Sequence, residues 1–145
     1  MSSNWPQAAR TLLGRNPGLA GRILRELMKV DLPPVIQYTL LTPVCGDGPP
    51  GHPAPEMIIL AGPVTDPVHA VVVEFLRGRD HDARRRWPRY AAAVWLAHGC
   101  PVNLLVLCPD ELTAHWADRP VATSLDDYVC RPAVLILEDL GPIAP

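Results

Sequence analysis

The sequence has almost no lysine, and this scarcity limits what its positive charge can imply. Lys29 is the only lysine, so the other 12 of the 13 basic residues are arginines. A GC-rich genome also produces chains rich in arginine, alanine and proline, so the arginine bias alone indicates no function. The net charge of −2 excludes a general attraction to nucleic acid. Any such binding has to come from locally clustered arginines.

Zinc-type cysteine spacing and long apolar runs are also missing. The four cysteines are Cys45, Cys100, Cys108 and Cys130. No two of them form a C-x-x-C pair, which disfavours a zinc site. Cys100 and Cys108 flank an apolar segment and are expected to be small core residues. No segment approaches the roughly 18 apolar residues of a membrane span, and the N-terminus lacks a basic stretch followed by a long apolar run. We therefore expect a reduced, cytoplasmic protein without a membrane segment.

The length of 145 residues suits one domain with a core of its own. Residues 1–31 are expected to form N-terminal helices, and residues 35–145 an α/β core. Eighteen prolines, against a typical share of about 5%, predict many short elements joined by stiff connections. Residues 43–55 contain five prolines and three glycines and predict a long loop, either functional or an elaborated hairpin connection.

Apolar periodicity predicts the element order α-α-β-β-β-α-β-α-β. Helices are expected over 6–13, 17–28, 82–98 and 110–116, and strands over 35–41, 56–60, 69–75, 102–108 and 133–137. The second and third strands are close in sequence, which indicates an antiparallel hairpin. The helix after the third strand implies a right-handed crossover to a parallel fourth strand. The sequence thus predicts a mixed β-sheet flanked by helices, with the two N-terminal helices covering one of its faces.

Residues 71–90 hold the candidate site. Glu74 ends a buried strand, and six arginines fall between positions 77 and 89. With Asp80 and Asp82 counted, the local excess is four positive charges, which suits an anionic ligand. Pro88 lies within the predicted helix and either kinks it or marks a later start.

Five short segments stand out along the chain: Val71-Val72-Val73-Glu74, Gly78-Arg79-Asp80, Arg86-Trp87-Pro88-Arg89-Tyr90, Cys100-Pro101-Val102 and Leu105-Val106-Leu107-Cys108-Pro109-Asp110. These segments resemble small actinobacterial proteins of the PD-(D/E)XK nuclease-like superfamily. Arg86 and Tyr90, four residues apart, are also similar to the helix that follows the catalytic strand in transposase-associated Rpn-type nucleases. The resemblance implies a β-β-β-α-β core of restriction-endonuclease-like type.

The resemblance also implies a metal site. In such nucleases two carboxylates on adjacent strands hold Mg²⁺ against the scissile phosphate. Glu56 corresponds to the first acid, with glutamate in place of the family's aspartate, and Glu74 matches the second. A lysine or glutamine two residues later would position the attacking water, but Leu76 stands here. Gln7 corresponds to an acid that many members carry on the first helix. These departures indicate a degenerate active site.

Three functions remain open on these observations. The first is a degenerate nuclease-like domain, catalytically weak or inactive, that binds nucleic acid or a protein partner. The second is a residual Mg²⁺-dependent nuclease that uses Glu56 and Glu74, with Mg²⁺ as its cofactor. The third is a protein-interaction subunit or homo-oligomer without a nucleic-acid role, docking through apolar edges and the loop 43–55. In the first and third, no cofactor is needed.

Helical geometry divides the arginines into two groups. Arg85 and Arg89 are four residues apart and are expected to be exposed and free to bind nucleic acid, together with Arg84 and Arg79. Arg86 and Tyr90 lie on the neighbouring stripe and are expected to be structural, with the Arg86 guanidinium held by Glu74. The simpler interpretation of this cluster is a solvated face that pairs with nearby aspartates.

Overall fold

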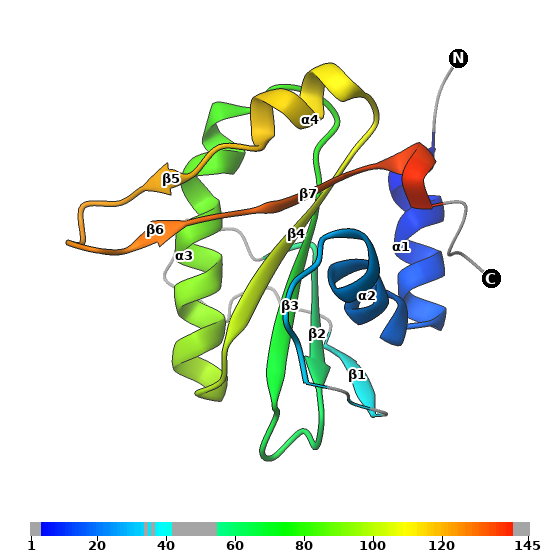
Figure 1. Ribbon diagram of the computed structural model, residues 1–145, viewed down its shortest axis with the longest axis vertical. Helices are drawn as coiled ribbons and strands as arrows, with labels where there is room; N and C mark the ends of the chain where they lie inside the picture. The colour runs from blue at the N-terminus through cyan, green and yellow to red at the C-terminus, as the bar shows by residue number, and fades with distance from the viewer. Residues whose placement is uncertain (1–3, 34, 36, 42–54, 141–145) are drawn as a thin grey trace.

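The computed structural model describes residues 4–33, 35, 37–41 and 55–140. Its centre is a five-stranded sheet in the order β1-β2-β3-β4-β7 (Figure 1). The strands are β1 (Tyr38–Leu41), β2 (Met57–Ala61), β3 (His69–Phe75), β4 (Val102–Cys108) and β7 (Ala133–Ile136). The helices are α1 (Trp5–Arg15), α2 (Gly18–Arg22), α3 (His81–His98) and α4 (Glu111–Ala117). A π-helical turn, η1 (Ile23–Leu27), follows α2, and a 3₁₀ turn, η2 (Leu137–Leu140), follows β7.

The sheet is mixed, as the sequence predicts. The strands β1, β2 and β3 pair antiparallel, while β3, β4 and β7 pair parallel. The long apolar strands β3 and β4 have the predicted bounds. The sequence predicts a first strand over 35–41, but β1 is shorter and begins at Tyr38. The strand β2 lies one residue later than the predicted strand 56–60.

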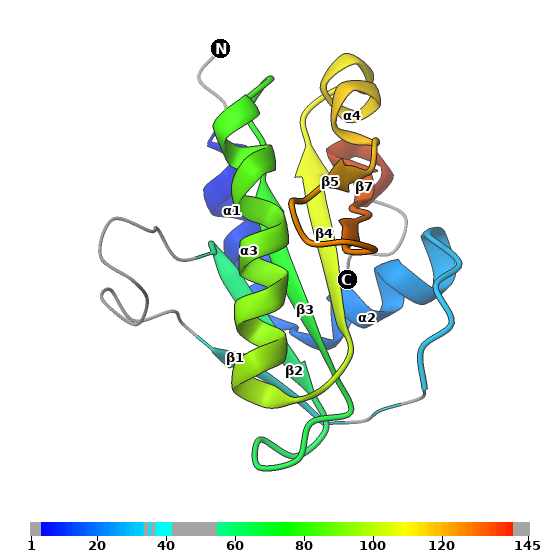
Figure 2. The same ribbon diagram turned by 90° about the vertical axis from the view of Figure 1, so that its left-hand side faces the viewer.

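Helices cover both faces of the sheet. The alternation of β3 sends Val71, Val73 and Phe75 into a core with α1 and α2, whereas Val72 faces a second core with α3 and α4. Figures 1 and 2 show α3 on the face opposite α1 and α2. The prediction that the N-terminal helices cover one face is confirmed.

The helix α3 is continuous through Pro88. It begins after Asp80, whose Oδ1 accepts a hydrogen bond from the Ala83 backbone N–H at 3.1 Å. It ends at Gly99, which adopts the left-handed conformation with φ 64°. Pro88 lies in the helix interior, so the alternative of a later helix start is wrong. The helix therefore carries all four of Arg84, Arg85, Arg86 and Arg89 on one rigid element.

The predicted order omitted a small hairpin between α4 and β7. Its strands, β5 (Val121–Ala122) and β6 (Val129–Cys130), have two residues each and give too little periodicity to predict. The Tyr128 hydroxyl donates a hydrogen bond to the Pro88 carbonyl and joins this hairpin to α3. The predicted second helix is also corrected, because its later part is the π-helical turn η1.

Other predictions have mixed outcomes. Cys100, Cys108 and Cys130 are buried free thiols, so the core role expected of the first two is confirmed. Cys45 and the predicted loop 43–55, apart from Pro55, lie outside the described residues. No helix among the described ranges is long and apolar enough to cross a membrane.

Candidate functional site

A pocket of about 380 Å³ lies where β3 ends and the chain turns into α3. Its lining includes Leu76, which is 4% exposed, and Trp87, which is fully buried. Charged residues make up much of the remaining lining: Glu56, Glu74, Arg77, Arg79, Asp80 and Arg86. This arrangement follows from the sequence, because the buried strand and the capped helix converge on the short connection 76–80.

The pocket brings together the two acids predicted to form a metal site. The antiparallel register pairs Met57 with Val73, so Glu56, which precedes β2, comes next to Glu74. The Glu56 backbone N–H donates a hydrogen bond to Glu74 Oε1 at 3.3 Å. Leu76 lies in the same apolar core as Val72, on the face of Glu74, as strand alternation predicts.

Glu74 is poorly solvated. Burial raises the pKa of Glu74 to about 7, and the nearby Glu56 carboxylate also raises it. The hydrogen bond from the Glu56 backbone and the positive charge of Arg86 act in the opposite direction on this pKa. Burial prevails, so Glu74 is close to half protonated at neutral pH.

Glu56 has a different environment, created by a residue that the sequence interpretation missed. Arg10, on α1, places its Nη2 2.8 Å from Glu56 Oε2. Its Nη1 donates a hydrogen bond to Gln7 Oε1 at 2.9 Å, and its guanidinium carbon lies 5.1 Å from the centre of the Phe75 ring. No local pattern predicts the contact with Glu56, because the two residues are 46 positions apart.

Arg84 does not face a ligand surface, contrary to prediction. Its Nη2 donates to the backbone carbonyls of Arg119 at 3.0 Å and Pro120 at 3.4 Å. Its guanidinium lies over the Trp116 ring, with the carbon 5.5 Å from the ring centre. Burial lowers the pKa of Arg84. Arg84 therefore links α3 to the segment that follows α4.

Arg86 lies in the pocket, but the predicted ion pair with Glu74 is wrong. The ion pairs within 4.0 Å among the described residues do not include one between Arg86 and Glu74. The Arg86 Nε is buried and has no hydrogen-bond partner. Tyr90 is buried beside it, and burial raises the pKa of Tyr90 while Arg86 lowers it. The pair is thus packed as expected for structural residues, and no ion pair holds Arg86 to a single carboxylate.

The remaining predicted arginines are exposed. Arg85 makes a surface ion pair with Asp82 at 3.6 Å, so it is exposed but not free. Arg89 is exposed on the next turn of α3. Arg79 is exposed and lines the pocket, as does Arg77, which was not among the predicted binding residues.

A divalent cation does not fit this arrangement. Among the described residues, no group of three or more histidine, cysteine or acidic side chains is placed to hold a metal ion. One Glu56 oxygen already contacts the Arg10 guanidinium. The two acids of the pocket therefore do not by themselves supply the oxygen ligands that Mg²⁺ coordination needs.

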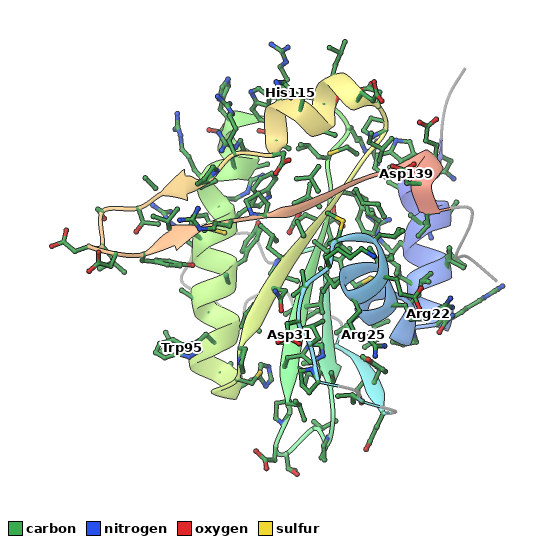
Figure 3. All side chains as sticks on the ribbon, in the orientation of Figure 1. Arg22, Arg25, Asp31, Trp95, His115 and Asp139 are labelled. Atoms are coloured by element: carbon green, nitrogen blue, oxygen red, sulfur yellow. The ribbon has the colours of Figure 1, made fainter. Side chains whose placement is uncertain are left out.

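Two further surface features lie away from this pocket. Trp95 and Leu96, on the later part of α3, are 57% and 76% exposed, and Figure 3 shows Trp95 pointing away from the sheet. A wider groove of about 600 Å³ runs between α4 and β7 and includes His115 and Asp139, also labelled in Figure 3. Three acids and no arginine line this groove, so it is electrostatically unlike the β3–α3 pocket.

Comparison with known proteins adds no assignment. No protein-family model, no curated protein and no solved structure matches the chain.

Proposed function

We propose that this protein is a degenerate domain of PD-(D/E)XK nuclease-like fold that binds nucleic acid without cleaving it. Three antiparallel strands followed by a helical crossover to a parallel strand support the fold proposal. The hydrogen bond from the Glu56 backbone N–H to Glu74, between the start of β2 and the end of β3, supports it further, because the resemblance matches these two positions to the acids of such nucleases.

The ion pair between Arg10 and Glu56 carries the proposal that cleavage is lost. An arginine guanidinium contacts the carboxylate that would otherwise bind Mg²⁺, at 2.8 Å. Buried Leu76 replaces the polar group that would position the attacking water. Losing one charge-stabilising group commonly reduces an enzyme's rate by about 10²–10³. Here the metal ligands and the water-positioning group are affected together.

Exposed arginines support the binding half of the proposal. Arg77 and Arg79 lie at the pocket, and Arg85 and Arg89 are exposed on successive turns of α3. Guanidinium groups pair well with phosphate oxygens. Because phosphate contacts release counterions, this binding should weaken steeply as salt increases.

The direct test is fluorescence anisotropy with labelled single-stranded and double-stranded oligonucleotides at about 50 and 200 mM salt. We expect salt-sensitive binding by the wild-type protein and a loss of at least about tenfold in Arg85→Ala/Arg89→Ala, whose melting temperature should hardly change. Arg131→Ala, also an exposed arginine but outside the pocket and α3, is the matched control. Absence of binding at low salt would overturn the nucleic-acid role and favour a protein-interaction surface.

The other candidate raised by the sequence is a residual Mg²⁺-dependent nuclease that uses Glu56 and Glu74, and the poor fit of a divalent cation at these acids disfavours it. The same oligonucleotides incubated with Mg²⁺ or Mn²⁺ distinguish it from the first. Cleavage that disappears in Glu74→Ala would establish the second candidate. Binding without cleavage would support the first.

A further inference from the structure

The strand β7 forms one edge of the five-stranded sheet, and that edge is open in the part of the chain that the structure describes. It pairs with β4 on one side, and no other described strand pairs with its outer side. An open edge presents unpaired backbone groups, which are a ready template for another extended chain. Figure 1 shows α4 beside this strand.

The register shows which backbone groups of β7 face outward. The Leu76 N–H donates to the Leu107 carbonyl at 2.9 Å, so Leu107 directs its backbone groups toward β3. Leu107 lies opposite Leu135 in the parallel register between β4 and β7, so the neighbours of Leu107 bond to Leu135. Because backbone groups alternate in direction along an extended strand, the N–H groups of Val134 and Ile136 point to the open edge.

The side chains of the same two residues line the groove between α4 and β7. Val134 and Ile136 are half-buried and apolar, and Leu112, which is 76% exposed, adds an apolar side chain from α4. The groove has a volume of about 600 Å³. Since side chains of an extended strand alternate between its faces, a strand added at the edge would direct every second side chain toward this groove.

The groove is negatively charged. Glu111, Asp118 and Asp139 line it, and none of the three makes an ion pair within 4.0 Å with another described residue. Arg119 and Arg131 are near these elements in sequence but do not line the groove. Pairing of β7 with β7 of a second copy would bring like charges together, which is unfavourable. The charge therefore favours a cationic partner strand over a second copy.

We infer that β7 and α4 bind an extended segment of a partner protein, which adds to the open edge as a further strand and carries lysine or arginine at alternate positions. The methylene stems of these side chains pack on Val134 and Ile136, while their charged ends reach the three acids. Backbone hydrogen bonds supply affinity in strand addition, and side-chain contacts supply specificity. The groove and the β3–α3 pocket share no lining residue, so this inference does not rest on nucleic-acid binding.

The probe is a fluorescein-labelled octapeptide of alternating valine and arginine, and the control peptide carries glutamate in place of arginine. Anisotropy at about 50 mM salt should show saturable binding of the arginine peptide alone. Asp118→Asn/Asp139→Asn should weaken binding by at least about tenfold, because it removes two of the three charges. Asp66→Asn/Asp126→Asn removes two exposed acids outside the groove and should change binding by less than about twofold.

Methylation of the peptide backbone tests strand addition. One version is N-methylated at every valine and another at every arginine. Successive N–H groups of an extended peptide point to opposite sides, so only one of these sets faces β7. One version should therefore lose at least about tenfold in affinity, and the other should bind like the parent peptide. On binding, hydrogen exchange at the Val134 and Ile136 amides, measured by NMR, should slow more than at Leu135, which already pairs with β4.

Each outcome decides a specific point. Equal loss of affinity in the two double variants would indicate a general effect of net charge and would overturn the groove as the site. Equal binding of the two N-methylated peptides would overturn strand addition. Failure of the arginine peptide to bind at low salt would overturn the whole inference. All four substitutions are at exposed positions, so unchanged melting temperatures are expected and show that both variants are folded.

Discussion

Glu56, just before β2, and Glu74, near the end of β3, both line the pocket, and the two side chains have opposite electrostatic environments. Glu56 is partly exposed and forms an ion pair with the Arg10 guanidinium at 2.8 Å. Glu74 is largely buried, without an ion pair among the described residues, and its pKa is raised to about 7. The two glutamates match one motif but differ in burial and in ion pairing. This difference matters because the pKa of a carboxyl depends on burial and on the nearest cation rather than on residue type.

The largest effect is expected from Leu76→Lys, which would give Glu74 a cation of its own. Leu76 is 4% exposed, and losing its apolar contacts while burying an amine should lower the free energy of unfolding by about 3 kcal/mol. The melting temperature should fall by about 6–12 °C. Leu76→Met is the control and should cost less than about 1.5 kcal/mol. Equal melting temperatures for Leu76→Lys and wild type would show that this position is not part of the core.

The next largest effect is the pH dependence that Glu74 imposes on stability. The pKa of Glu74 in the folded state, about 7, lies above its value in the unfolded state. The contribution of Glu74 to stability is therefore complete at pH values below the unfolded-state pKa and is lost as pH rises through 7. The free energy of unfolding of Glu74→Gln relative to wild type should therefore rise by about 2 kcal/mol between pH 5 and pH 8. Urea denaturation at both pH values measures this change.

Glu56→Gln provides the contrast in the same experiment. Because Glu56 contacts the Arg10 guanidinium and is partly exposed, removing its charge should not stabilise the protein. A gain equal to that of Glu74→Gln would show that the two acids share one environment, and the comparison would fail.

The sequence predicted the scaffold of the pocket more successfully than its contacts. The β-branched run of β3 and the apolar run of β4 are local signals and gave the correct strands, while α3 begins one residue before the predicted range 82–98. The contact between Arg10 and Glu56 joins residues distant in sequence and leaves no periodic signal. Arg84 and Arg85 are adjacent and chemically identical, but only tertiary packing placed Arg84 against Trp116 and left Arg85 exposed.

The smallest expected effect is that of Arg10→Ala on stability. The side chains of Arg10 and Glu56 are 32% and 43% exposed, and ion pairs at this level of exposure contribute about 0.2–1 kcal/mol. A double-mutant cycle with Glu56→Gln isolates the coupling between the two side chains. A coupling energy of several kcal/mol would mean that the pair is a major structural contact rather than a local neutralisation of Glu56.

Binding of Mn²⁺ tests most directly whether the Arg10 ion pair and the raised pKa of Glu74 prevent Glu56 and Glu74 from binding a metal ion. The measurement is a titration of the wild-type protein at pH 7, followed by the electron paramagnetic resonance signal of free Mn²⁺, with Glu56→Gln/Glu74→Gln as the reference. We predict that wild type binds no more Mn²⁺ than this double variant. Saturable binding by wild type that is lost in the double variant would contradict the account, because Glu56 and Glu74 would then form a working metal site with Arg10 in place.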